Sequence, residues 1–133
     1  MIEPIEFLIG NVVPKAWGHE YHIVNNDFYC LKKLVFLPGK KMSGHSHDEK
    51  SETWHIEKGR FVMTYFDLNN ADVLTRELKS GDIVHIPRGN PHQLEAVEKV
   101  DDSVVLEVST KDRPEDNYRI IKGDSQLSLP ILS

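Results

Sequence analysis

Two histidines separated by one residue, with a glutamate five positions later, are the residues of this sequence best suited to chemistry. His45 and His47 would share one face of a β-strand because strand side chains repeat every two residues. Glu52 can reach that face if 48–51 form a turn, and His92 follows a second glycine-marked turn. Imidazole nitrogens and carboxylate oxygens are ligands for Zn, Mn, Fe or Ni. The spacing therefore predicts a divalent-metal site with positions left open for a small-molecule substrate.

The segments around these residues read as short strands separated by turns. Turn-forming residues recur every eight to twelve positions or so, the spacing of an all-β sandwich or barrel. The predicted strands are Tyr21–Val24, Phe28–Leu37, Thr53–Glu57, Arg60–Asp67, Val73–Leu78, Ile83–Ile86 and Val104–Val108. Apolar residues in both registers of Phe28–Leu37 predict burial on both faces. From Thr110 onward we expect a surface extension with one helical turn at Pro114–Tyr118.

The glycines that bracket the candidate ligands complete two motifs. The first runs from Gly39 through His45, His47 and Glu52 to Gly59, and the second is Gly81, five residues, Pro87-Arg88-Gly89, two residues and His92. Both resemble the signature motifs of the cupin superfamily, although Ala96 stands where the second usually ends in asparagine. The resemblance implies an all-β double-stranded β-helix, or jelly-roll barrel. We expect a single domain over 1–133 with its core at about 14–110, an N-terminal arm and a C-terminal tail.

The flanking residues narrow the resemblance. Lys15–Tyr21, Glu52-Thr53-Trp54, Ile86–Gly89 and Leu106–Val108 are similar in order to the mannose-6-phosphate isomerase type II cupin domain. That family tends to carry glutamine at the position of His45, so the ligand set here is the general cupin set of three histidines and one glutamate. The resemblance implies an isomerase or epimerase that acts on a sugar phosphate or a nucleotide-linked sugar and transfers a proton between adjacent carbons.

Several other residues are candidates for the site. Glu107 is an acidic residue in an apolar strand, so it is either a general base with a raised pKa or the partner of a nearby arginine. Candidate substrate-binding residues are Trp17, Lys41, Trp54, Arg88 and Arg119. The two tryptophans would border a sugar or pack in the core. The three cations would hold a phosphate or remain solvated.

Length, charge and cysteine content restrict the function classes. The chain has 133 residues, a formal net charge of −5 and one cysteine. The negative charge argues against nucleic acid or an anionic membrane as a partner, and no apolar run is long enough to span a bilayer. A lone cysteine forms no internal disulfide, which favours a cytoplasmic protein. The apolar segment Ile2–Val13 predicts a homodimer in which this arm covers an exposed sheet edge.

Three functions remain open on the sequence alone. The first is the metal-dependent isomerase or epimerase. The second is a non-haem iron oxygenase that uses the open metal positions for dioxygen and an organic substrate. The third is a non-enzymatic cupin that binds a sugar or another small ligand, because a fold by itself does not decide function.

Overall fold

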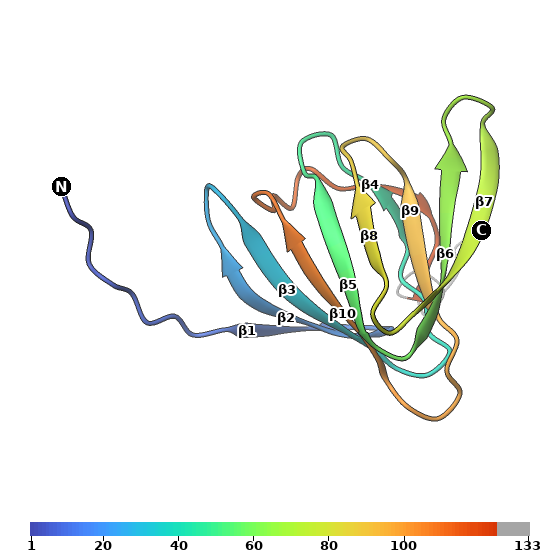
Figure 1. The fold of residues 1–133 in the computed structure, drawn as a ribbon, viewed down its shortest axis with the longest axis horizontal. Coiled ribbons are helices and arrows are strands. Elements are labelled where there is room, and N and C mark those ends of the chain that lie inside the picture. Colours follow the sequence, from blue (N-terminus) through green and yellow to red (C-terminus); the bar gives the residue numbers. More distant parts are fainter. Residues whose placement is uncertain (125–133) are drawn as a thin grey trace, which may run out of the picture.

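The computed structural model describes residues 1–124, which form strands joined by short turns (Figure 1). Most of these strands alternate buried and exposed side chains, as expected where one face packs on a core. The strands are β1 (Asn11–Lys15), β2 (Gly18–Asn25), β3 (Cys30–Phe36), β4 (Gly44–Ser46), β5 (Glu52–Lys58), β6 (Arg60–Asp67), β7 (Asp72–Lys79), β8 (Ile83–Ile86), β9 (His92–Ala96), β10 (Ser103–Ser109) and β11 (Tyr118–Ile121).

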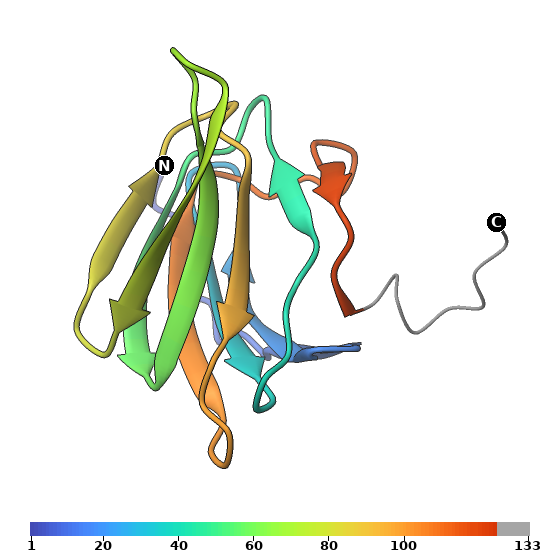
Figure 2. The same ribbon diagram turned by 90° about the vertical axis from the view of Figure 1, so that its right-hand side faces the viewer.

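The strands form two antiparallel sheets that face each other as the layers of a jelly roll (Figure 2). The six-stranded sheet has the order β1-β2-β3-β10-β5-β8, and the five-stranded sheet has the order β11-β4-β9-β6-β7. The core between the sheets is apolar and aromatic, with Trp17 stacked on Phe36 at 4.3 Å between ring centroids. The predicted all-β jelly-roll class is confirmed.

A glycine joins the two sheets at the end of β5 opposite to Glu52. Gly59 connects β5 of one sheet to β6 of the other with a φ of 82°. A Cβ at this position would lie 2.1 Å from Ser103 Oγ. Both the left-handed backbone and the close approach therefore require glycine here.

The predicted strands are confirmed, two of them with identical bounds, while the ends of the chain differ from expectation. Arg60–Asp67 and Ile83–Ile86 match β6 and β8. The prediction that Phe28–Leu37 is buried on both faces is wrong, because Leu31 and Val35 are half-buried and Lys33 is exposed on the outer face of β3. The predicted helical turn at Pro114–Tyr118 is also wrong: a non-helical turn there leads into β11, which the sequence did not reveal.

The first ten residues extend away from the sheets as an arm (Figure 1). Its apolar side chains do not pack in the core: Ile2 is 96% exposed, Phe7 94% and Ile9 96%. Within residues 1–124, no helix has the length and apolar character needed to cross a membrane.

Candidate metal centre

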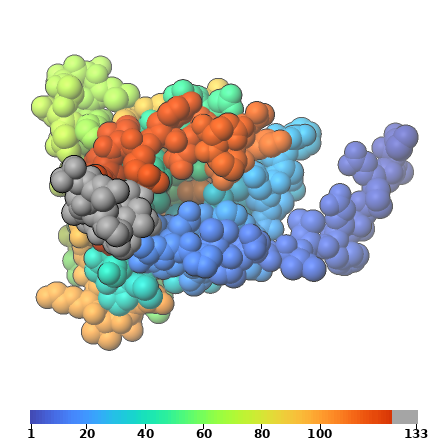
Figure 3. Space-filling model, turned by 180° about the vertical axis from the view of Figure 1, so that it is seen from behind, coloured from blue at the N-terminus to red at the C-terminus, as the bar shows by residue number. Residues whose placement is uncertain are grey.

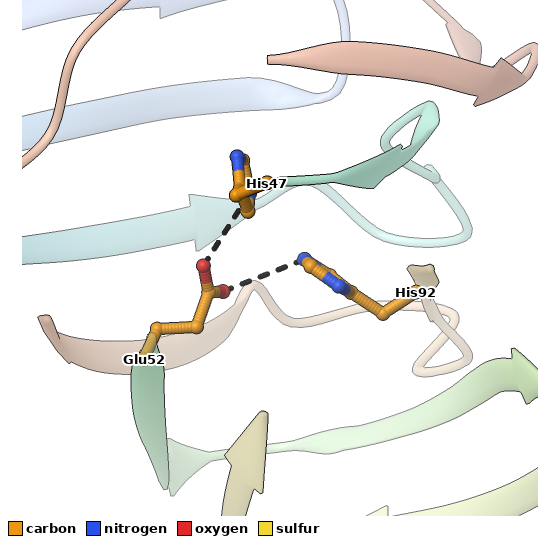
Figure 4. Close-up of side chains that lie close together, drawn as sticks. All are labelled: His47, Glu52 and His92. Atoms are coloured by element: carbon orange, nitrogen blue, oxygen red, sulfur yellow. Dashed lines mark ion pairs between the residues drawn. The ribbon is translucent and has the colours of Figure 1, made fainter. Parts of the chain in front are cut away.

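Three of the four predicted ligands converge between the sheets. The ligating atoms of His47, Glu52 and His92 all lie within 4.8 Å of one another, and all three side chains are buried (Figure 4). His47 Nε2 lies 3.4 Å from Glu52 Oε2, and His92 Nε2 lies 3.5 Å from Glu52 Oε1. His47 follows β4, while Glu52 and His92 are the first residues of β5 and β9. Both sheets therefore contribute to the cluster.

The hydrogen bonds of the two imidazoles leave a lone pair on each nitrogen that faces Glu52. His47 Nδ1 lies 2.8 Å from the carbonyl oxygen of Asp116, and His92 Nδ1 lies 2.8 Å from that of Asn90. A carbonyl oxygen only accepts, so each Nδ1 carries the hydrogen and each neutral ring presents an unprotonated Nε2. Such second-sphere bonds are typical of metal-binding histidines.

One oxygen of the third group, Glu52, makes no hydrogen bond within residues 1–124. Glu52 Oε2 is buried and has no hydrogen-bond partner among the described residues. Lys50 Nζ lies 3.4 Å from this oxygen without forming a hydrogen bond, and both oxygens of the carboxyl face imidazole lone pairs. The donor set fits a divalent cation of the nitrogen/oxygen type, which would satisfy all three groups at once.

Burial determines how these groups titrate without an ion. It lowers the pKa of His92 to about 4 and also lowers the pKa of His47, so both rings are neutral at physiological pH. Burial, with the negative charge of Glu107 close by, raises the pKa of Glu52 to about 8. The charge of Lys50, whose Nζ lies 3.4 Å from Glu52 Oε2, lowers this pKa but does not outweigh burial and Glu107.

His45, the fourth predicted ligand, lies beside this cluster without joining it. Its ring centroid is 6.4 Å from that of His47, and its Nε2 forms a short hydrogen bond with Ser43 Oγ. Burial, the neighbouring histidines and the charges of Arg119 and Lys15 lower the pKa of His45 to about 4. His45 faces the same cavity as His47 and His92, so a ring rotation away from Ser43 is what ligation would require.

A network of buried charges lies next to the three ligands. Lys50 is 5% exposed, and its Nζ lies 3.4 Å from Glu52 Oε2, 3.7 Å from Glu107 Oε2 and 3.2 Å from Asp112 Oδ1. Lys32, 7% exposed, pairs with Asp112 at 2.6 Å and lies 3.9 Å from Glu20. Buried charges are stable only when paired, so this network fixes the protonation of the cavity wall.

Glu107 belongs to this network and points into the cavity. One of its two predicted roles was to pair with an arginine, but the structure places Lys50 beside it, with Trp54 Nε1 donating a hydrogen bond to Glu107 Oε1 at 3.3 Å. Burial raises the pKa of Glu107, but the charges of Lys50 and Lys32 outweigh it, and the net shift is downward. The alternative of a raised pKa is therefore wrong, and Glu107 is an ionised carboxylate.

The sequence did not predict the roles of Lys32, Lys50 and Asp116. The Asp116 carboxylate accepts hydrogen bonds from the backbone N–H groups of Asp48, Glu49 and Lys50, and so fixes the turn between His47 and Glu52. Lys32 has the same strand parity as the inward Leu34, whereas Lys50 lies in the turn before β5 and has no strand register. For Lys32 that alternation was the available signal, but it was outweighed by the usual exposure of lysine.

A cavity of about 350 Å³ opens over the cluster, a size within the range of small-molecule sites. Of the five predicted substrate-binding residues, Trp17 and Arg119 line it. Trp54 is fully buried beneath His92, with ring centroids 5.3 Å apart. Lys41 and Arg88 are not among the lining residues. In Figure 3 the blue segment around β1 and β2 and the orange-red segment leading to β11 lie on opposite sides of a hollow.

Two curated relatives named as mannose-1-phosphate guanylyltransferases are much longer than this chain. A mannose-1-phosphate guanylyltransferase of Sinorhizobium fredii is 30% identical over 80 residues, 60% of this chain and 14% of that protein. Mannose-1-phosphate guanylyltransferase 2 of Escherichia coli O157:H7 is 27% identical over 90 residues, 68% of this chain and 17% of that protein. The chain thus spans less than a fifth of the length of these relatives.

Solved structures share the fold at lower identity. The capsular polysaccharide assembling protein CapF of Staphylococcus aureus matches with a TM-score of 0.75 and 18% identity, over 87% of this chain and 34% of CapF. Oxalate decarboxylase of Bacillus subtilis matches with a TM-score of 0.73 and 17% identity, over 84% of this chain and 30% of that one.

The family assignment comes from the central part of the chain. The sequence model of the Cupin domain family matches residues 33–109, which contain all four predicted ligands. This match covers more than half of the 133 residues and agrees with the jelly-roll topology and with the fold of the solved neighbours. The chain belongs to the cupin family.

Proposed function

We propose that this protein is a metal-dependent isomerase or epimerase acting on a small sugar phosphate. The observation that carries the proposal is the convergence of His47, Glu52 and His92 beside an ionised Glu107 in one cavity. The guanylyltransferase relatives, which by name act on mannose 1-phosphate, support a sugar-phosphate substrate. Oxalate decarboxylase, whose Mn(II) centres are documented, is a precedent for metal in this fold.

His47, Glu52 and His92 would hold the ion, with His45 as the fourth ligand after its ring leaves Ser43. A bound divalent ion supplies Lewis acidity that polarises the substrate carbonyl. Zn, Mn, Fe and Ni all suit this donor set.

The protein residues then divide the proton transfer between them. In the isomerase reaction Glu107 accepts the proton from the hydroxyl-bearing carbon next to the carbonyl and returns it to the former carbonyl carbon, while the hydroxyl proton moves to the former carbonyl oxygen, so substrate and product are isomers with no net redox change. Lys50, which lies 3.7 Å from Glu107 Oε2, keeps that carboxylate ionised. The Trp54 indole N–H fixes its orientation. These contacts make Glu107 a positioned base in a site shielded from bulk water.

The direct test is an assay of aldose and ketose phosphates with metal-loaded protein. We expect interconversion of at least one pair, lost on chelation and restored by the ion, with solvent deuterium entering the product carbon. Dioxygen consumption dependent on iron would instead identify an oxygenase. Ligand binding without turnover under every metal would identify a non-enzymatic binding protein.

We also propose that the protein is a homodimer joined through its N-terminal arm. The arm is apolar and exposed, and with Ile23, Phe28 and Tyr29 of the β2–β3 hairpin it borders a groove of about 860 Å³. Apolar surface of this extent is usually covered by another molecule, and a second copy of the arm has matching chemistry.

Phe7→Asp is expected to convert the dimer to a monomer, because it places a charge in the apolar contact. Light scattering at micromolar concentration measures the change. Leu68→Asp is the matched control: Leu68 is 64% exposed in the β6–β7 turn, and its replacement should leave the dimer intact. A wild-type protein that is monomeric at this concentration would contradict the proposal.

A further inference from the structure

The inner end of the cavity carries more acidic than basic residues, whereas the charged residues of its rim are all basic. The inner wall carries the carboxylates Glu20, Glu52, Glu107 and Asp112, with Lys32 and Lys50 among them. The remaining charged residues of the lining are all cations: Lys15, Arg113 and Arg119. The cavity therefore has an acidic inner end, suited to a metal cation, and a basic rim, suited to an anion.

Two of the rim cations come from the edge strands of opposite sheets. Lys15 is the last residue of β1, the edge of the six-stranded sheet, and shares its inward face with Val13. Arg119 lies in β11, the edge of the five-stranded sheet. It pairs in register with His45 of β4, and side chains directly opposite on antiparallel strands share a face. Both cations therefore border the cavity next to His45.

Lys15 and Arg119 differ from the inner lysines in their partners. Lys32 and Lys50 are each paired with carboxylates. Among residues 1–124, neither Lys15 nor Arg119 has a hydrogen bond or an ion pair through its side chain, while Arg113 lies 3.5 Å from Glu49. Unpaired cations from two strands at the rim of a binding cavity are the arrangement that captures an oxyanion, with the guanidinium able to donate two parallel hydrogen bonds.

We propose that Lys15 and Arg119 form a phosphate-binding site at the cavity rim. The phosphate ester of the substrate rests between them while its carbonyl end reaches the cluster of His47, Glu52 and His92. The placement of the carbonyl end at the cluster rests on the proposed function, whereas the phosphate site itself does not. The site replaces Lys41 and Arg88, which lie outside the cavity lining, as the anchor of the anion.

The test is a titration of the full-length protein with inorganic phosphate, followed by nuclear magnetic resonance. Phosphate should shift the backbone signals of Lys15, His45 and Arg119. Lys15→Gln and Arg119→Gln should each weaken binding about fivefold or more, as expected for loss of a charge-assisted hydrogen bond. Arg88→Gln removes the same charge from an exposed loop position outside the cavity and should leave the affinity within about twofold. Acetate, a planar carboxylate, should bind more weakly than phosphate.

A second measurement distinguishes phosphate binding at the rim from phosphate binding at the metal site. Glu52→Gln removes a predicted metal ligand and should leave phosphate affinity nearly unchanged. Equal weakening by Arg88→Gln and Arg119→Gln, or loss of binding in Glu52→Gln alone, would overturn the proposal. A protein that binds phosphate at the rim but turns over no sugar phosphate would refute the isomerase function and leave this site standing.

Discussion

Glu107→Gln is expected to reduce isomerase turnover by roughly 10²-fold or more, the usual scale for loss of a general base. The substitution keeps the shape of the side chain and leaves an oxygen to accept the Trp54 hydrogen bond, but an amide cannot take up the substrate proton. Metal content should stay unchanged, because Glu107 is outside the ligand cluster. Steady-state kinetics on the metal-loaded variant measures the effect.

Glu20→Gln is the matched control for this variant. Glu20 lines the same cavity and bonds His22, but it is not paired with Lys50 or the ligand cluster. Its replacement should change turnover only slightly. If Glu107→Gln kept full turnover, Glu107 would not be the base; a lowered melting temperature with normal turnover would mark it as a structural partner of Lys50.

The second large effect is on stability. Lys50→Met should destabilise the protein by about 3–5 kcal/mol, because it removes the cation that three buried or half-buried carboxylates share. Chemical denaturation of the metal-free protein measures the change. Lys79→Met is the control: Lys79 is exposed, its pair with Asp82 spans 3.6 Å, and such surface pairs contribute little.

The loss of unfolding free energy caused by Lys50→Met, called the deficit below, should also depend on pH. The positive charge of Lys50 lowers the pKa values of both Glu52 and Glu107, so its loss raises both in the folded state, and the pKa of Glu52 already lies above its unfolded value. A group with a raised folded pKa stabilises the protein below its unfolded pKa, and this contribution is lost as pH rises through the folded pKa. The deficit should therefore shrink on acidification from neutral pH toward about 4.5. A deficit constant over this range would contradict the role assigned to Lys50.

The strand pattern was predictable where one face of a strand packs on the core. Glu52, Trp54 and Ile56 alternate in the sequence and are all buried on one face of β5. The edge strands were harder to predict. β11 is almost fully exposed and so has no hydrophobic alternation, and its pairing with β4 joins residues more than 70 positions apart. The inner strands can be predicted from their local alternation of apolar and polar residues, whereas edge strands such as β11 form through long-range pairing that no local pattern reveals.

The convergence of three of the four predicted ligands could be anticipated from the sequence, but the position of His45 outside the cluster and the charge network could not. The motif spacing identified His47, Glu52 and His92, because fixed strand and turn lengths bring them together. Lys32 and Lys50 were not predicted, since lysine is rarely buried. Their burial depends on Asp112, which lies 80 and 62 positions away along the chain. No local pattern reports a contact of that kind.

The most direct test of the central claim is the metal content of the purified protein after reconstitution, measured by elemental mass spectrometry. We predict about one Zn, Mn, Fe or Ni ion per chain, reduced to less than about a tenth in His92→Ala and Glu52→Gln, because a cluster with one donor missing loses most of its affinity. His55→Ala, in which the lost ring bonds only Glu57 at the surface, should keep the full complement. A wild-type protein that binds no divalent ion, or ligand variants that bind as much as His55→Ala, would contradict a metal centre formed by His47, Glu52 and His92.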